Sequence, residues 1–176
     1  VLLAGLRERA GDPSTALEQV NEALRENPED SESWYLKAKL HYVRNEPGRA
    51  LGALDQLFNL DRQHGPSWAL QSKLLSNEPN RLEDALKAAI HAVALGEPEW
   101  ILKADLLMQL DRFEEAILSL QSVLDIDPDN GLVRAHLSLL HMLDDNNEVA
   151  RKILVESSPK ACLLYTSDAA DEEASV

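Results

Sequence analysis

An alanine that returns at a nearly constant interval is the strongest constraint on what this sequence can fold into. Five such alanines stand in the segments "STALEQV", "GRALGAL", "EDALKAA", "EEAILSL" and "NEVARKI". They are separated by 34, 35, 31 and 34 residues: Ala16, Ala50, Ala85, Ala116 and Ala150. Three tryptophans follow a similar interval, at spacings of 34 and 32: Trp34, Trp68 and Trp100. A period shared by two kinds of residue indicates an array of repeated structural units.

Each period contains two amphipathic segments of helical character. Segments such as "SESWYLKAKLHYV" and "PEWILKADLLMQL" carry apolar residues at three- and four-residue steps, which predicts a first helix in each unit. A short turn such as "NEP" or "LDR" follows, and a second helix runs from the alanine to "NPED" or "DPDN". Because alanine is small, it lets the two helices approach closely. The sequence therefore predicts an all-α fold of helix–turn–helix units.

The most regular copy, residues 97–130, resembles the tetratricopeptide repeat. It carries the pattern residues Trp100, Ala104, Leu107, Ala116, Leu120 and Pro128, and it departs from the pattern at Lys103. The resemblance covers residues 1–161, with a truncated first helix in the first copy. The third copy has about one extra residue in its turn and no terminal proline. The resemblance implies an α-solenoid of about five such repeats forming a right-handed superhelix.

Stacked helix pairs bury one continuous apolar core. We expect eleven residues of this core to face neighbouring helices: Leu17, Val20, Leu24, Leu51, Leu54, Leu86, Ile90, Ile117, Leu120, Ile153 and Leu154.

The resemblance also implies a concave groove that binds a partner. It would be lined by the second, fifth, ninth, twelfth and thirteenth residues of each repeat. The candidate partner-binding residues are Tyr35, Lys39, Tyr42, Lys73, Ile101, Asp105, Met108, Leu139 and Met142. The first four predict an aromatic and basic patch suited to an acidic peptide. Met108, Leu139, Met142 and Leu143 predict an adaptable apolar end. The alternative, that these residues only pack between first helices or are solvated, stays open.

Several classes of function are not supported by the sequence. The net charge of −14 disfavours nucleic acid as a partner, and no apolar run is long enough to span a membrane. The histidines form no H-E-x-x-H motif, no glycine-rich phosphate loop is present, and we expect no enzyme, cofactor or metal site. His41 and His141 share one repeat position, which predicts half-buried rings between helices. The carboxylate clamp of chaperone-binding relatives is not matched, because Tyr35 and Ala69 stand before Lys39 and Lys73.

The composition changes abruptly after Ala161. Residues 162–176 contain four acids and no Lys or Arg, and "CLLYTSDAADE" resembles a translated sequencing-adapter read-through. We therefore expect this tail to be non-native, disordered or adventitiously packed, and we assign no role to Cys162 or Tyr165. An ordinary disordered acidic tail is the alternative. We expect native sequence to be missing at both ends, because the chain begins at Val1 rather than Met and an adapter read-through would replace the native C-terminus.

Two functions remain open at this point. One is a scaffold that binds a peptide or helix of a partner protein in the groove. The other is a regulatory or targeting arm of a larger enzyme or of a secretion or assembly component. The sequence does not identify the partner, the compartment (cytoplasm or periplasm), the full repeat count or the oligomeric state.

Overall fold

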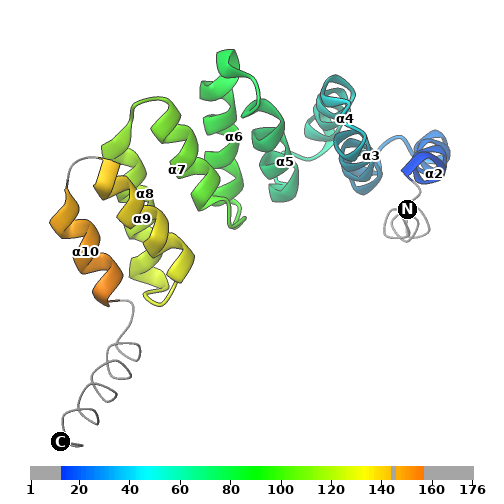
Figure 1. Cartoon of the computed structure of the whole chain (residues 1–176). Coiled ribbons are helices and arrows are strands. Elements are labelled where there is room, and N and C mark those ends of the chain that lie inside the picture. The colour runs from blue at the N-terminus through cyan, green and yellow to red at the C-terminus, as the bar shows by residue number, and fades with distance from the viewer. Residues whose placement is uncertain (1–12, 144–145, 157–176) are drawn as a thin grey trace, which may run out of the picture. The chain divides into compact units, whose positions relative to one another are not determined.

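The computed structural model describes residues 13–143 and 146–156, and most of these residues lie in α-helices joined by short turns. The chain folds as two compact units, and the boundary between them lies between Glu99 and Trp100. Both units are built of helices, so the all-α fold predicted from the repeat period is confirmed (Figure 1).

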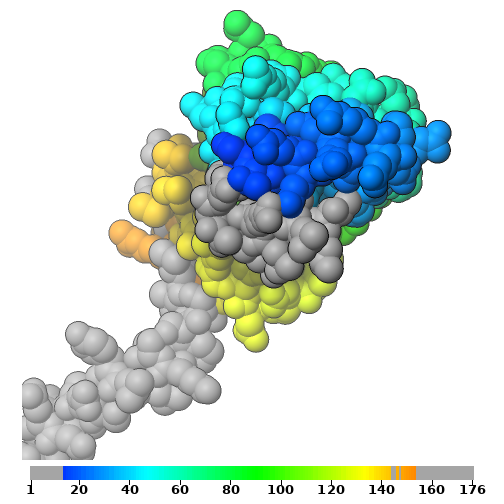
Figure 2. Space-filling view, turned by 90° about the vertical axis from the view of Figure 1, so that its right-hand side faces the viewer, coloured from blue at the N-terminus to red at the C-terminus, as the bar shows by residue number. Residues whose placement is uncertain are grey.

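Unit 1 contains two helix pairs, preceded by a single helix. The elements are α2 (Pro13–Glu26), α3 (Ser31–Val43), α4 (Pro47–Leu60), α5 (Gly65–Leu75), a 3-10 turn η1 (Pro79–Arg81) and α6 (Leu82–Ala94). Helix α2 packs on α3, α3 packs on α4 and α5 packs on α6. Residues 13–60 form one continuous surface in the space-filling view (Figure 2, blue to cyan). The truncated first helix of the first repeat lies outside the described residues.

Unit 2 contains two further pairs. They are α7 (Trp100–Gln109) with α8 (Phe113–Ile126), and α9 (Gly131–Leu143) with α10 (Asn147–Glu156). Contacts also join α8 to α9, so the two pairs stack on one another. Unit 2 therefore repeats the helix–turn–helix plan of unit 1.

Small residues hold the two helices of each pair at close range. The repeated alanines of the second helices are at most 1% exposed: Ala16, Ala50, Ala85, Ala116 and Ala150. The first helices carry small buried residues at a matching interval: Ala38, Ser72, Ala104 and Ser138. Where that residue is serine, its Oγ donates to the carbonyl of the repeated alanine, over 2.9 Å in Ser72–Ala85 and 3.1 Å in Ser138–Ala150. The role predicted for the repeated alanine is thus confirmed.

In three of the first helices, a side chain near the start of the helix donates a hydrogen bond to a backbone carbonyl of the preceding turn. The indole Nε1 of Trp34 donates to the Pro28 carbonyl over 2.8 Å, and that of Trp68 donates to the Arg62 carbonyl over 2.9 Å. In α9 the corresponding residue is Arg134, whose Nε donates to the Pro128 carbonyl over 2.8 Å. The spacing of six residues between donor and acceptor is the same in all three. Trp34 and Trp68 therefore make a polar bond at the repeated tryptophan position, and Arg134 makes the same bond in α9.

Backbone geometry ends the helices at their turns. Asn45 and Asp111 occupy equivalent positions two repeats apart, and each has φ of 57°, in the left-handed region. The next residue donates its N–H to a carbonyl five residues earlier: Glu46 to His41 over 2.9 Å, and Arg112 to Leu107 over 2.8 Å. This is the bond of a Schellman cap, in which the left-handed residue is most often Gly and sometimes Asn.

The core matches most of the expected positions. Val20, Leu24, Leu54, Leu86 and Leu120 are buried. Leu17, Leu51, Ile117 and Ile153 are half-buried, and the Leu154 side chain lies outside the described ones.

The prediction for Ile90 is wrong, because its side chain is 45% exposed. The buried face of α6 consists of Leu86 and four alanines, Ala85, Ala88, Ala89 and Ala92. With so many alanines in one helix, hydrophobic spacing alone did not indicate which face is covered.

The predicted end of the repeats at residue 161 and the tail at residues 162–176 lie outside the described residues.

Replacement of a repeated alanine by leucine should separate the helices of its pair. We expect Ala85→Leu to destabilise the chain by about 1–3 kcal/mol, because the added atoms have no space at a fully buried site. The measurement is the midpoint of urea denaturation, followed by circular dichroism. Ala94→Leu, at an exposed position of the same helix, is the control and should change stability by about 0.5 kcal/mol or less. Equal midpoints for the two variants would contradict close packing at Ala85.

Candidate functional site

The predicted groove positions of α3, called its groove face below, are Glu32, Tyr35, Lys39, Tyr42 and Val43. Tyr35 and Lys39 are half-buried, and the Lys39 Nζ lies 5.9 Å from the centroid of the Tyr35 ring. A cation at this distance is attracted by the electron-rich face of the ring. The structure thus brings Tyr35 and Lys39 together, while Tyr42 is 43% exposed one helical turn further on.

Lys73 has a carboxylate partner that the sequence analysis did not foresee. Its Nζ lies 2.6 Å from Oε1 of Glu99, whose side chain is only 15% exposed. The Lys73 side chain remains 45% exposed. The positive charge expected at Lys73 is therefore offset within the chain.

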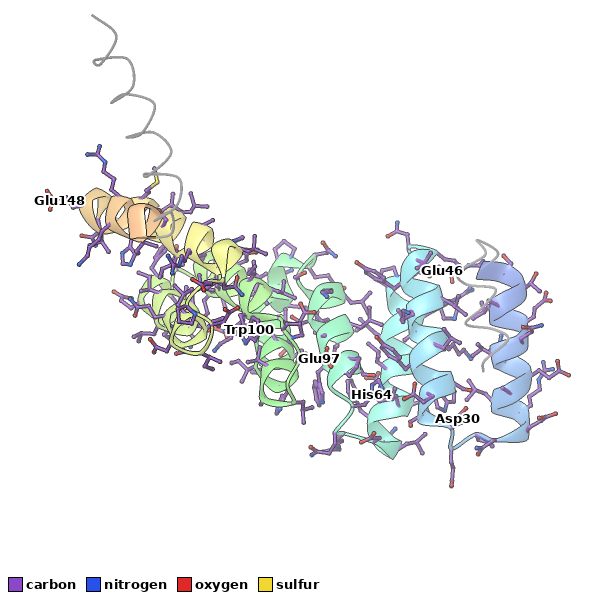
Figure 3. All side chains as sticks on the ribbon, turned by 90° about the horizontal axis from the view of Figure 1, so that it is seen from below. Asp30, Glu46, His64, Glu97, Trp100 and Glu148 are labelled. Atoms are coloured by element: carbon purple, nitrogen blue, oxygen red, sulfur yellow. The ribbon has the colours of Figure 1, made fainter. Side chains whose placement is uncertain are left out.

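His64 also belongs to this surface, and sequence reasoning missed it. Its ring lies 4.8 Å from the Tyr35 ring, its Nδ1 is 2.6 Å from the Ser67 hydroxyl, and its Nε2 is 3.5 Å from Glu32 Oε1. His64 immediately precedes α5 (Figure 3). The corresponding residue of the previous repeat, Asp30, accepts a hydrogen bond from the Ser33 hydroxyl over 2.5 Å. The matching spacing of Asp30–Ser33 and His64–Ser67 is the signal that could have indicated this residue.

Tyr42 borders a hollow between two inter-helix turns of unit 1. The hollow has a volume of about 390 Å³ and is lined by Tyr42, Asn45, Pro47, Leu74, Asn77 and Glu78. Asn77 and Glu78 lie in the widened turn of the third repeat, next to η1. The extra residue in that turn, seen in the sequence, is thus accommodated as a 3-10 turn beside this hollow.

The candidate residues of α7 are more enclosed than those of α3. Ile101, Asp105 and Met108 are all half-buried. Burial raises the pKa of the Asp105 carboxyl, and the charge of His136 on α9 opposes that shift. The Nδ1–H of His136 donates to the Leu132 carbonyl over 2.9 Å.

The predicted groove positions of α9, called its groove face below, form an exposed apolar surface of unit 2. All five predicted positions of this helix are exposed. Four of them carry large apolar side chains with exposures of 50–60%: Leu132, Leu139, Met142 and Leu143. The fifth is Ala135. The opposite side of α9 is buried through Val133, Leu137 and Leu140.

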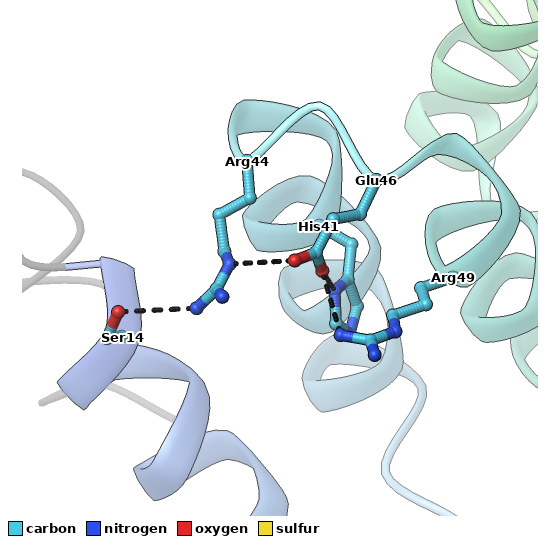
Figure 4. A network of polar contacts seen from close by, with 5 residues as sticks. All are labelled: Ser14, His41, Arg44, Glu46 and Arg49. Carbon is cyan, nitrogen blue, oxygen red and sulfur yellow. Dashed lines mark hydrogen bonds and ion pairs between the residues drawn. The ribbon is translucent and has the colours of Figure 1, made fainter.

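A polar network lies at the turn between α3 and α4, at the end of α3 opposite to Asp30 (Figures 3 and 4). The Glu46 carboxylate accepts a hydrogen bond from His41 Nδ1 over 2.6 Å, and from Arg44 Nε and Arg49 Nη1 over 3.3 Å each. Arg44 also donates to the Ser14 hydroxyl of α2 over 3.2 Å. The hydrogen bond from His41 is the main cause that lowers the pKa of Glu46, and the charges of Arg44 and Arg49 lower it further.

The inter-helix turns of the third and fourth repeats carry ion pairs in which the basic residue precedes the acidic one. Arg112 donates through Nε and Nη2 to the two carboxylate oxygens of Glu115 over 2.7 and 2.8 Å, and this bonding lowers the pKa of Glu115. Arg81 and Asp84 form the same pair across 3.6 Å. In both, the acid lies in the first turn of a helix, where the helix dipole favours negative charge. Among the turns that the structure describes, only that of the second repeat places the acid first, and there Glu46 also bonds to His41.

His41 and His141 are both buried between helices, at 5% and 8% exposure. His41 is bonded to Glu46, whereas both ring nitrogens of His141 lack a hydrogen-bond partner among the described residues. Asn146, whose side chain is one methylene shorter, occupies the position that corresponds to Glu46.

Within the described ranges, no three His, Cys, Asp or Glu side chains are grouped so that they could hold a metal ion. None of the helices described there has both the length and the apolar character that crossing a membrane requires.

Comparison with known proteins places these features in a family context. Two models of the tetratricopeptide repeat match the chain, over residues 9–74 and 100–130. No curated protein matches the sequence.

Several solved structures are similar in fold. MamA (41-end) from Desulfovibrio magneticus RS-1 is 20% identical with a TM-score of 0.75, over 88% of this chain and 89% of that one. YrrB, described as a TPR protein with an unusual peptide-binding site, is 17% identical with a TM-score of 0.71, over 94% and 88%. A structure of Naa15/Naa10 bound to HypK-THB is 18% identical with a TM-score of 0.66, over 88% of this chain and 24% of that one.

The Glu46 network should make stability depend on pH. Because the pKa of Glu46 is lowered in the folded chain, its charge stabilises the fold above its ordinary pKa of about 4.5. This contribution is lost as the pH falls through the lowered folded value. We expect Glu46→Gln to lower the urea midpoint at pH 7, and the difference from wild type to shrink below about pH 4.5.

Asp55→Asn is the control, because Asp55 is an exposed acid of α4 with no ion pair among the described residues. A Glu46→Gln deficit that persists undiminished at pH 3 would contradict a charge-based role for the network.

Proposed function

Because this chain belongs to the tetratricopeptide repeat family, we propose that it is a protein–protein interaction scaffold. It binds a peptide or helix of a partner protein through the groove face of its first helices. The residues that carry this binding are Tyr35, Lys39, Tyr42 and Lys73 in unit 1, and Ile101, Asp105, Met108, Leu139 and Met142 in unit 2.

The apolar groove face of α9 is the observation that most supports this proposal. Four large apolar side chains of one helix face are half or more exposed, although the opposite face of the same helix is buried. Covering apolar surface is favourable by roughly 25 cal/mol per Å². Large exposed apolar patches are typical of interaction sites. Methionine and leucine also adapt to partners of different shape.

The groove face of α3 offers a different chemistry. Tyr35 and Tyr42 present rings with a hydroxyl, and Lys39 lies close to the Tyr35 ring. Tyrosine combines apolar area with a polar group and is common in interfaces. Lys73 can contribute if a partner carboxylate replaces Glu99, because the Lys73 side chain remains 45% exposed.

The similar structures support the same class of function. YrrB is described as having a peptide-binding site, and Naa15/Naa10 as bound to HypK-THB. Tetratricopeptide repeats are generally non-catalytic interaction modules, and we propose no enzymatic activity for this chain. The alternative of a regulatory or targeting arm has no observation in its favour. Exclusion of nucleic acid remains a prediction from the net charge of −14.

The apolar part of the groove can be tested with peptides selected on the full chain from a random library. For peptides that bind unit 2, we expect the double variant Leu139→Ser, Met142→Ser to weaken affinity at least about tenfold, because two apolar contacts are lost. Isothermal titration calorimetry measures the affinity. The control is Leu118→Ser, which changes a leucine of 62% exposure on α8. Peptides that respond to Leu118→Ser and not to the double variant would place binding outside the groove.

The basic part of the groove predicts a preference for acidic peptides. We expect Lys39→Glu combined with Lys73→Glu to weaken binding of a selected acidic peptide by about tenfold or more, and to weaken it less at high salt. The same titration at 50 and 500 mM NaCl measures both effects. Lys87→Glu is the control, because Lys87 is an exposed lysine of α6 that is paired with Asp84 over 3.4 Å. If the double variant binds the acidic peptide with unchanged affinity, the basic patch is not part of the binding site.

A further inference from the structure

A second pocket lies on another side of α3, between α2 and α4. It has a volume of about 440 Å³, and we name it the Lys37 pocket. Its lining residues are Leu17, Asn21, Trp34, Lys37, His41, Arg49, Gly52 and Ala53. All of them belong to unit 1.

The Lys37 pocket is separate from the groove face. Successive residues of an α-helix are turned by about 100°. Trp34, Lys37 and His41 therefore share one side of α3, while Tyr35, Lys39 and Tyr42 share a side turned by roughly 130° from it. No residue lines both surfaces. A ligand of the Lys37 pocket would leave the groove face accessible.

The lining of the pocket is cationic in a chain whose net charge is −14. Lys37 and Arg49 give the lining this charge, and none of the lining residues is an acid. The Lys37 Nζ lies 5.0 Å above the Trp34 ring, and no carboxylate among the described residues forms an ion pair with it. Burial lowers the pKa of the Lys37 ammonium. A partly desolvated cation without a counter-charge is a favourable position for a ligand carboxylate.

Arg49 retains capacity for a second partner. Its side chain is 70% exposed and contacts Glu46 through Nη1 over 3.3 Å. A guanidinium has five N–H donors, so most of them remain for a ligand. Glu46 does not line the pocket, and its charge is already shared with His41 and Arg44 (Figure 4).

Gly52 opens the pocket in the middle of α4. Glycine inside a helix is less favourable than alanine by roughly 0.5–1 kcal/mol. No atom lies within 4 Å of where its Cβ would be, so packing within the chain does not require glycine here. The corresponding residues of other repeats are larger: Glu18, Lys87 and Leu118. An absent side chain at this position allows another backbone to approach α4 closely.

We propose that the Lys37 pocket binds an acidic segment of a partner protein, in which a Glu or Asp lies next to a leucine-sized apolar residue. Lys37 and Arg49 receive the carboxylate. Trp34, Leu17 and Ala53 contact the apolar side chain, and the segment passes over Gly52. This site goes beyond groove binding, because it gives unit 1 a second binding surface that can be occupied at the same time as the groove.

The test uses two peptides that differ only in charge, acetyl-Leu-Glu-Leu-amide and acetyl-Leu-Gln-Leu-amide. Each is titrated into the ¹⁵N-labelled full chain and followed by NMR. We expect the glutamate peptide to shift the indole N–H signal of Trp34 and the amide signal of Gly52, and to bind at least about fivefold more tightly than the glutamine peptide.

Two variants and a matched control locate the site. Lys37→Met should lower the affinity for the glutamate peptide about fivefold or more, because the counter-charge of its carboxylate is lost. Gly52→Leu should abolish binding of this peptide, because the leucine side chain fills the opening of the pocket. Gly48→Leu is the control, because Gly48 lies in the same helix, has equally open space at its Cβ and does not line the pocket. Urea midpoints confirm that the variants are folded.

Three outcomes would overturn the proposal. The first is equal binding of the two peptides, which would show that the ligand carboxylate does not contribute to binding. The second is a set of shifts centred on Tyr35 and Tyr42, which places the peptide in the groove. The third is the absence of Trp34 shifts at 10 mM peptide. Groove variants such as Lys39→Glu should leave the Trp34 response intact, so failure of this site and failure of the groove are distinguishable.

Discussion

Close contact between the two helices of each pair is the constraint on which the rest of this structure depends. It requires a small residue on both helices at the point where they meet. The second helices supply alanines such as Ala50 and Ala116, and the first helices supply Ala38 and Ala104 or the serines at the same position. This contact joins the interior of the first helix to the first turn of the second, and it fixes which sides of the first helix turn outward. The groove face and the Lys37 pocket are two such sides of α3, so both surfaces follow from the same contact.

The sequence predicted the repeat architecture well because that architecture depends on spacing. The alanine period located the helix pairs, and the groove positions of α9 proved to be exposed as a set. Side-chain pairing was harder to predict. Glu99, the partner of Lys73, lies 26 residues further along the chain, and nothing local links the two. Ile90 was misassigned because small alanines, rather than larger apolar side chains, form most of the buried face of its helix. His64 was missed because it occupies a position where the previous repeat has Asp30, and one substitution at a turn conceals the equivalence.

The turns show how the repeats tolerate different charges. Backbone caps at Asn45 and Asp111 end the first helices in the same way, so the next side chain is not needed for the cap. That residue is an acid at Glu46 and a base at Arg112, and in each case a residue three positions later carries the opposite charge. The acid-first order at Glu46 has a consequence for its surroundings. Glu46 bonds to both His41 and Arg49, which line the Lys37 pocket. A change of charge order at one turn therefore alters the binding surface beside it.

The bond from Trp34, Trp68 or Arg134 to a carbonyl six residues earlier joins the end of one repeat to the beginning of the next. An indole and a guanidinium make this bond equally, so the shared element is an N–H donor of sufficient reach rather than an aromatic ring. The repeats of Trp34, Trp68 and Arg134 consequently carry, within their own sequence, the connection to their predecessor. Repeats of this kind could be duplicated, deleted or exchanged without redesigning the junction, which offers a simple route by which such arrays change their length during evolution.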